Sequence, residues 1–459
     1  MKKIVLSLTA AMVFAWQGMS FASSSVDALI QKLEDKGILT DQDANQLKGE
    51  ISSNEQNSQQ NTFKSLLPDW LNSMKLSGDF RLRDQWQVRH DRVTAASAND
   101  LARNRGRMRA RLNVEDQVND KVKVIVGIAT NGESGSFPGN DRSNNITFGG
   151  NGGSEGTFNK SALVLNKAYA IYTPASYVTL MGGQMDNPIW EPASLLWDPD
   201  ITPIGGVVQF QKKLNDLVTP FSTTGFFIVK DQTPAVSPVA TNTKTDPYIF
   251  FTQNGVKGNV TEKVYYKAAV TYYNFADPNH FVLDNSNATN ELSTATTGGY
   301  NNNFELFGGS FDLGMNDPFG ELLPSPIYIP QIGLFGQYFQ NLDPSHQNAA
   351  WEMGAYVGSS AINGFGTWKL QSYWKVLERN SWMDALPDDD FYSGDTDTEG
   401  LRTQLDVGLA KNVWLTLAYF HTNVYKYFRG TTSSGSATLG AFSQSAPEDL
   451  WQMDLNFKF

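Results

Sequence analysis

The chain of 459 residues contains no cysteine. This absence excludes disulfide bridges, thiol catalysis and zinc sites built on thiolates. Only four histidines occur, and none has a serine and an acid nearby in the arrangement of a hydrolase. We therefore expect no catalytic residue, no metal and no cofactor. The formal net charge of −11 argues against a nucleic-acid partner.

Long hydrophobic runs are also missing. Beyond the first 22 residues there is no run of about 18 apolar residues, so the sequence predicts no transmembrane helix. The first residues themselves have the pattern of a signal peptide: Lys2 and Lys3, then a short apolar stretch over 4–16, then small residues ending at Ala22. We expect cleavage after Ala22 and export. An exported chain without disulfides needs an extended core or a closed hydrogen-bonded sheet to hold it.

Residues 23–62 carry the one helical pattern. Apolar residues from Val26 to Leu33 recur at helical spacing, Gly37 interrupts them, and Thr40 with Asp43 resembles a capping box. Residues 52–62 are polar and of low complexity, which is typical of a linker. The segment predicts a periplasmic helical hairpin, either simply solvated or forming a coiled coil that trimerises or touches the cell wall.

From Lys75 to Phe459 the period changes to two, the period of β-strands. The pattern predicts sixteen strands: 75–89, 102–115, 121–130, 162–173, 176–186, 205–214, 220–230, 246–258, 263–275, 304–314, 327–340, 349–361, 365–378, 400–411, 413–427 and 449–459. Connections after even-numbered strands are mostly short and those after odd-numbered strands mostly long. This alternation is typical of an antiparallel outer-membrane barrel, with periplasmic turns at one end and external loops at the other.

The final strand alternates without interruption. Trp451, Phe457 and Phe459 belong to its apolar face, and polar or charged residues such as Asp454 form the other. In a transmembrane barrel the first face meets lipid and the second meets water. A terminal Phe also resembles the signal that such barrels present to the barrel assembly machinery. We therefore predict that Trp451, Phe457 and Phe459 form a membrane-insertion signal.

The second predicted strand carries a ladder of arginines at every second position. Charges that recur on one face of a membrane strand must look into water, because a lipid-facing charge is costly. We predict a basic strip along a pore wall that attracts anionic groups. In the alternative interpretation, Asp79, Glu115 and loop acids neutralise the ladder. With two arginines of the first strand, the strip comprises Arg81, Arg83, Arg103, Arg105, Arg107, Arg109 and Arg111.

The loop over residues 186–203, between the fifth and sixth predicted strands, differs from a freely solvated loop. It is stiffened by prolines and contains an apolar cluster that includes Trp190 and Trp197, which favours a loop folded into the barrel against the wall. Acids of this loop would oppose the arginines and set up a transverse field across a constriction. These acids are Asp186, Glu191, Asp198 and Asp200.

Three stretches carry a resemblance to a known family. They are Lys36–Thr40 (KGILT), Gly183–Pro188 (GQMDNP) and Leu196–Asp200 (LWDPD). With sixteen predicted strands, the chain resembles the putative-porin family of Gram-negative outer-membrane porins over essentially its whole mature length. The resemblance implies a passive diffusion channel for small hydrophilic solutes and ions, often trimeric, in contact with lipid and lipopolysaccharide. Gln184 departs from the basic residue expected there.

Two rival classes stay open at this point. The barrel could be a non-conducting scaffold for adhesion or cell-wall anchoring, or the chain could be a soluble secreted β-protein.

A further question concerns the acids crowded over residues 384–399. They predict a solvated acidic external loop in preference to a calcium-binding one, because their spacing matches no defined calcium loop.

Overall fold

The computed structural model describes residues 73–90, 101–131, 142–149, 162–230, 246–278, 299–322, 328–426 and 447–459, with short pieces in some of the gaps. The predicted signal peptide and helical hairpin lie outside these residues. Contacts divide the chain into two units, Met1–Ser73 and Met74–Phe459, and the second is the part described below. Among the described residues, no helix is long and apolar enough to cross a membrane.

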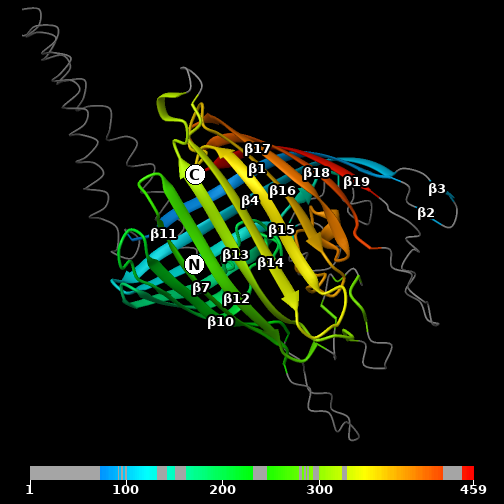
Figure 1. The fold of residues 1–459 in the computed structure, drawn as a ribbon, viewed down its shortest axis with the longest axis horizontal. Coiled ribbons are helices and arrows are strands. Elements are labelled where there is room, and N and C mark those ends of the chain that lie inside the picture. Colours follow the sequence, from blue (N-terminus) through cyan, green and yellow to red (C-terminus); the bar gives the residue numbers. More distant parts are fainter. Residues whose placement is uncertain are drawn as a thin grey trace, which may run out of the picture. The chain divides into compact units, whose positions relative to one another are not determined.

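Sixteen long strands of the second unit form a closed antiparallel barrel, as predicted (Figure 1). Each strand pairs with its sequence neighbours, and β1 pairs with both β4 and β19, which closes the sheet. The strands are β1 (Lys75–Arg89), β4 (Leu101–Asn119), β5 (Val122–Asn131), β7 (Ala162–Ala175), β8 (Val178–Gln184), β9 (Ile204–Gln211), β10 (Thr219–Ile228), β11 (Tyr248–Asn259), β12 (Val264–Phe275), β13 (Glu305–Asn316), β14 (Gln331–Asn341), β15 (Ala349–Gly358), β16 (Trp368–Leu377), β17 (Thr398–Ala410), β18 (Val413–Val424) and β19 (Glu448–Lys458).

Short elements complete the described structure. β2 (Val93–Thr94) pairs with β3 (Ser97–Ala98), and β6 (Ile146–Thr147) pairs with β4. Two 3₁₀ helices, η2 (Gly320–Leu322) and η3 (Tyr392–Gly394), lie in connections. The connections alternate in length around the barrel. The β7–β8 and β17–β18 links have two residues each, whereas 19 residues join β8 to β9 and 20 join β16 to β17.

The two faces of the wall differ as the period of two requires. On β19, Trp451 and Met453 are each 50% exposed on the outward face, while Gln452 and Asp454 point inward and are buried. The closing register places Trp86 opposite Trp451 and Phe80 opposite Phe457, so aromatic side chains pair across the seam on the outward face. Lipid replaces water as the solvent of this face, which explains why large apolar residues are exposed there.

The main hydrophobic core lies inside the barrel. Leu195, Leu196 and Trp197 of the β8–β9 connection pack with inward-facing wall residues such as Phe227 and Tyr273. Two residues of the β16–β17 connection, Trp382 and Met383, join the same cluster. Both connections therefore fold into the barrel, because their apolar side chains are buried only against its inner wall.

The expectation of a solvated acidic loop over residues 384–399 is wrong. Asp384, Asp388 and Asp397 are all buried, at 0%, 6% and 7% exposure. Asp384 accepts hydrogen bonds from the Ser286 hydroxyl and the Thr289 backbone amide. The apolar residues just before the acids draw the segment inward. Acid spacing alone could not reveal this, because the interior supplies the donors that replace water.

Candidate functional site

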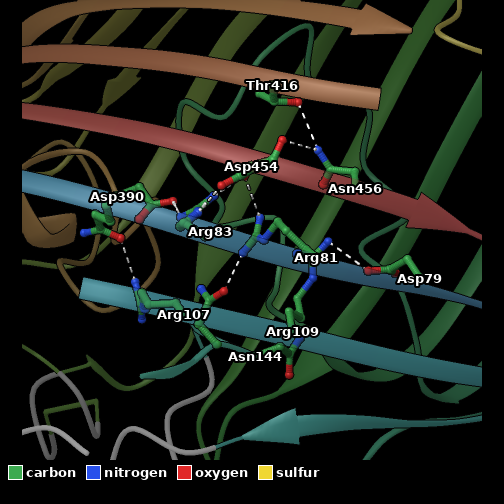
Figure 2. Close-up of polar contacts among 12 residues, drawn as sticks. Asp79, Arg81, Arg83, Arg107, Arg109, Asn144, Asp390, Thr416, Asp454 and Asn456 are labelled. Atoms are coloured by element: carbon green, nitrogen blue, oxygen red, sulfur yellow. Dashed lines mark hydrogen bonds and ion pairs between the residues drawn. The ribbon is translucent and has the colours of Figure 1, made fainter. Parts of the chain in front are cut away.

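The arginine ladder lies on the inner wall where β1 and β4 pair. Their register places Arg81 opposite Arg109 and Arg83 opposite Arg107, so like charges face each other across the two strands. Directly opposed like charges destabilise a strand pair unless counter-charges intervene. Figure 2 shows the acids that approach this group from β1, β19 and the β16–β17 connection.

Arg83 is the most completely paired member. Its Nε and one terminal nitrogen donate to the two carboxylate oxygens of Asp454 at 2.8 and 2.9 Å, and its other terminal nitrogen donates to Asp390 at 2.8 Å (Figure 2). Arg81 lies 3.7 Å from Asp454 and donates to Asn145 at 2.6 Å. A planar guanidinium held bidentately is fixed in orientation as well as in charge.

Asp79 and Asp200 neutralise the half of the ladder nearer the β4–β5 turn. Arg109 donates to both acids at 3.1 Å, and Arg111 donates to Asp79 at 2.6 Å and to Asp200 at 3.3 Å. Asp200 belongs to the β8–β9 connection, so this loop reaches the ladder. Burial alone would raise the pKa of Asp200, but Arg109 and Arg111 hold it below its usual value. Asp200 is therefore a fixed negative charge.

Arg105 and Arg107 also donate to neutral amide side chains of β1. Arg107 is 2% exposed and donates to the Gln85 side chain at 3.1 Å, while Arg105 donates to Gln87 at 3.2 Å. Arg103 is exposed near the first residue of β4. Acids also approach this part of the ladder: burial alone would raise the pKa of Asp390, but Arg83 and Arg107 hold it below its usual value.

The other predicted loop acids do not face the ladder. Asp186 is exposed and pairs with Lys167 at 2.6 Å. Glu191 is partly buried near Glu352 and Lys375, where desolvation and the Glu352 charge raise the pKa of Glu191 to about 8. Gln184 pairs in register with Ala168 and Ile204 and donates to Thr202 at 3.1 Å.

Asp198 meets two acids of the β16–β17 connection instead. Its carboxylate oxygens lie within 4.8 Å of those of Asp388 and Asp389, and its backbone amide donates to Leu386 at 2.7 Å. Burial, together with the charges of neighbouring aspartates that include Asp390, raises the pKa of Asp198, Asp388 and Asp389. Among the described residues this trio is the group that could hold a metal ion, since hard cations prefer carboxylate oxygens. Calcium binding by the acidic segment, which the spacing of its acids disfavoured, stays an untested alternative.

Sequence reasoning missed three residues of the site. Asp390 could not be found, because it reaches Arg83 only when the β16–β17 connection folds inward. Asp454 was expected to face the pore, but its pairing with Arg83 depends on barrel closure. Arg402 of β17 was missed because it does not belong to a row of arginines at every second position. It donates to the Tyr373 hydroxyl at 3.1 Å and to Gln404 at 2.7 Å.

A lumen cavity of about 390 Å³ opens beside these groups. It is lined by Arg81, Arg83, Ile362, Arg402, Gln404, Asp406, Trp414, Thr416, Ala418, Gln452, Asp454 and Asn456. A second cavity of about 230 Å³ is lined by Pro192 of the β8–β9 connection and by wall residues that include Tyr265 and Tyr356. Both have mainly polar linings, which suit water and hydrophilic solutes.

The predicted membrane-insertion residues lie on the outward face or at its end. Trp451 is 50% exposed and stacks on Tyr419 with ring centroids 4.1 Å apart. Phe457 packs on Phe80 of the closing strand. Phe459 is 60% exposed, and its backbone bonds to that of Gly78.

A closed sixteen-stranded barrel with an apolar exterior, a charged interior and an inward-folded loop defines the class of outer-membrane porins. Comparison with known proteins agrees. The profile of the family described as "Putative porin" matches residues 94–311 and 333–459, so the chain belongs to this family and is an outer-membrane porin channel. No curated protein matches the chain by sequence.

One solved structure shares the fold at low identity, and other channel structures are similar at lower TM-scores. The high-pH structure of OprB from Pseudomonas putida has a TM-score of 0.51 and 9% identity, covering 85% of this chain and 96% of that one. The outer-membrane channel DcaP of Acinetobacter baumannii has a TM-score of 0.42 and 12% identity, covering 84% and 97%. A mutant of the Rhodopseudomonas blastica porin has a TM-score of 0.39 and 11% identity, covering 84% and 100%.

Proposed function

We propose that this porin is a passive diffusion channel for small hydrophilic solutes and ions. One observation carries the proposal: the arginines of β1 and β4 and the acids of two inward-folded connections share one polar lumen wall, beside a cavity of about 390 Å³. Fixed opposite charges at a constriction orient water and polar solutes, and they penalise apolar ones. No bond needs to form or break, which agrees with a channel family.

Single-channel recording in a planar bilayer tests conduction directly. We expect discrete steps in salt solution, because the lumen is wet and polar. A protein that is folded, as judged by heat-modifiable migration on a gel, and yet gives no steps would contradict the proposal. That result would favour the second candidate, a non-conducting scaffold for adhesion or anchoring. The apolar cluster packed inside the barrel supports this candidate.

We propose that the ladder biases the channel toward anions. Replacing Arg105, Arg107 and Arg109 by glutamine should shift the reversal potential in a salt gradient toward cation preference. Replacing the same three residues by lysine is the matched control, since it keeps the charge and should keep most of the selectivity. Equal selectivity in the glutamine variant and the parent would mean that counter-charges screen the ladder.

Assembly partners follow from the same architecture. We propose that the barrel assembly machinery inserts the chain, that lipid and lipopolysaccharide surround it, and that the channel is a homotrimer. The exposed aromatic residues of the closing seam support the contact with lipid.

A further inference from the structure

Two lysines face each other across β11 and β12 on the inner wall. The register places Lys257 of β11 directly opposite Lys267 of β12. Both positions alternate with outward residues such as Val270, which is 50% exposed, and both lysines are half-buried. Like charges directly opposite each other destabilise a strand pair unless a counter-charge lies near them. The lysine pair therefore needs a negative partner.

The described part of the chain supplies no such partner at ion-pair distance. Neither lysine ammonium forms a salt bridge or a hydrogen bond with another residue there. Asp312 of β13 is in register with Lys267, but its carboxylate accepts a hydrogen bond from the Tyr356 hydroxyl at 2.7 Å. The arginine ladder differs in this respect, because Arg83 and its neighbours contact carboxylates directly.

Two aromatic rings hold the Lys267 side chain in place. Its Nζ lies 4.1 Å from the centroid of the Trp190 ring and 5.1 Å from that of Phe221. Gln253, which is 1% exposed, fixes Trp190 by accepting from its backbone amide at 3.0 Å and donating to its carbonyl at 2.9 Å. A ring face attracts a cation but carries no net charge. The rings therefore position the ammonium and leave its charge uncompensated.

The pair lies nearly half-way round the barrel from the arginine ladder. The ladder strands are the first and second of the sixteen long strands, whereas β11 and β12 are the eighth and ninth. Lys257 and Lys267 both lie within three residues of the strand ends that the β11–β12 turn joins. The lumen thus carries a second basic group, on the wall opposite the ladder.

We propose that Lys257 and Lys267 form a binding subsite for a small oxyanion, a phosphate or carboxylate group carried by a solute in the channel. The inference rests on the proposed diffusion function and names the class of solute. An oxyanion between the two ammoniums supplies the counter-charge that both lack. Each ammonium is a compact charge with three donors, so the pair suits oxyanions of different shape. Basic side chains that line a pore select anions in the same way.

Thermal unfolding of the full-length protein in detergent tests binding without requiring conduction. Inorganic phosphate and succinate are the probes, each compared with sodium chloride at the same ionic strength. A ligand that binds only the folded barrel raises its melting temperature. We expect at least one probe to raise the melting temperature of the parent, and neither to raise that of the double variant Lys257→Gln/Lys267→Gln.

The double variant Lys121→Gln/Lys411→Gln is the matched control. It removes the same charge from two exposed lysines in turns and should respond to the probes as the parent does. A response to phosphate alone assigns the subsite to phosphate groups, and a response to succinate alone assigns it to carboxylates. No response in the parent, or an equal response in Lys257→Gln/Lys267→Gln, would overturn the proposal.

Chloride current through single channels gives a second readout. The stabilising probe should reduce this current, and its half-blocking concentration should rise about tenfold in Lys257→Gln/Lys267→Gln. Lys257→Arg/Lys267→Arg keeps both charges and should keep the block. A protein that conducts but shows neither stabilisation nor block refutes the subsite and leaves the channel proposal intact. A protein that the probe stabilises but that does not conduct refutes the channel and leaves the anion site in place.

Discussion

At the scale of single residues, Arg83 holds the closing seam of the barrel together from the inside. Its side chain is 4% exposed, that of Asp454 is 6% exposed, and Asp390 approaches from a loop. Removing one member of such a group leaves a buried charge without compensation, which costs more than the ion pair contributes when intact. Arg83 therefore couples β1, β19 and the β16–β17 connection.

Arg83→Gln should lower the free energy of unfolding of the detergent-folded barrel by about 3–5 kcal/mol. The glutamine leaves Asp454 and Asp390 facing each other without their shared cation. Lys213→Gln is the control, because its pair with Asp216 is solvent-exposed and should contribute little to stability. Denaturant titration measures both variants, and equal small losses would show that the Arg83 pairs are dispensable.

Glu191 makes the β8–β9 connection sensitive to pH. Its folded pKa of about 8 lies above the value of 4.5 for a free glutamate, so the folded state binds a proton more tightly than the unfolded one. Stability falls as pH rises between these two values, by up to about 1.4 kcal/mol per pH unit. Above pH 8 the loop carries an additional partly buried charge beside Glu352.

Glu191→Gln should remove this loss of stability at high pH. We expect the melting temperatures of variant and parent to converge at pH 5 and to separate at pH 9, with the variant the more stable. Asp186→Asn is the control, because this acid of the same loop has a side chain that is 61% exposed. If the melting temperatures of Glu191→Gln and the parent change with pH in parallel, Glu191 is not the group that makes stability pH-dependent.

At the scale of elements, the two inward-folded connections form one unit. Trp197 of the β8–β9 connection and Trp382 of the β16–β17 connection pack edge to face with centroids 5.7 Å apart. Trp197 also donates to the Tyr273 hydroxyl at 3.3 Å, and the Asp389 amide donates to Asp198 at 3.0 Å. The position of one loop therefore depends on the other.

Trp382→Ala should destabilise this unit by about 3–5 kcal/mol, because it leaves a large cavity between the loops. We expect larger or noisier single-channel currents, since a loosened constriction samples wider states. Phe365→Ala in the β15–β16 turn is the control: the side chain is 87% exposed and should change stability by less than about 0.5 kcal/mol. Unaltered currents in Trp382→Ala would mean that the loops do not set the constriction.

At the scale of the whole molecule, barrel closure relies on the last strand. β19 pairs with β18 and β1, and the Phe459 backbone bonds to Gly78. The exposed Phe459 side chain adds little to packing in the folded barrel, so its effect should lie in assembly. Closure removes both sheet edges, which a membrane could not otherwise accommodate.

Phe459→Ala should reduce the amount of barrel recovered from outer membranes but leave the melting temperature of the purified barrel nearly unchanged. Leu322→Ala is the control, because Leu322 is 85% exposed in η2 and distant from the terminus in sequence. Quantitative blotting of membrane fractions measures the yield. A normal yield, or an equal loss in both variants, would argue against a terminal insertion signal.

The sequence by itself determined the strands, their two faces and the alternation of short and long connections. These features are local, because side chains alternate along any strand and the solvent on each side selects their chemistry. The arginine ladder could be predicted from the sequence for the same reason, since its members lie two residues apart.

Only the tertiary structure decided which acids meet those arginines. Asp390 and Asp454 lie 307 and 371 residues from Arg83 in the chain, and no local pattern connects them. Whether the two acidic loops fold inward or stay in solvent depended on whether Trp197 and Trp382 could be buried together inside the barrel. That choice is made by packing against the complete inner wall, which exists only after all sixteen strands have closed.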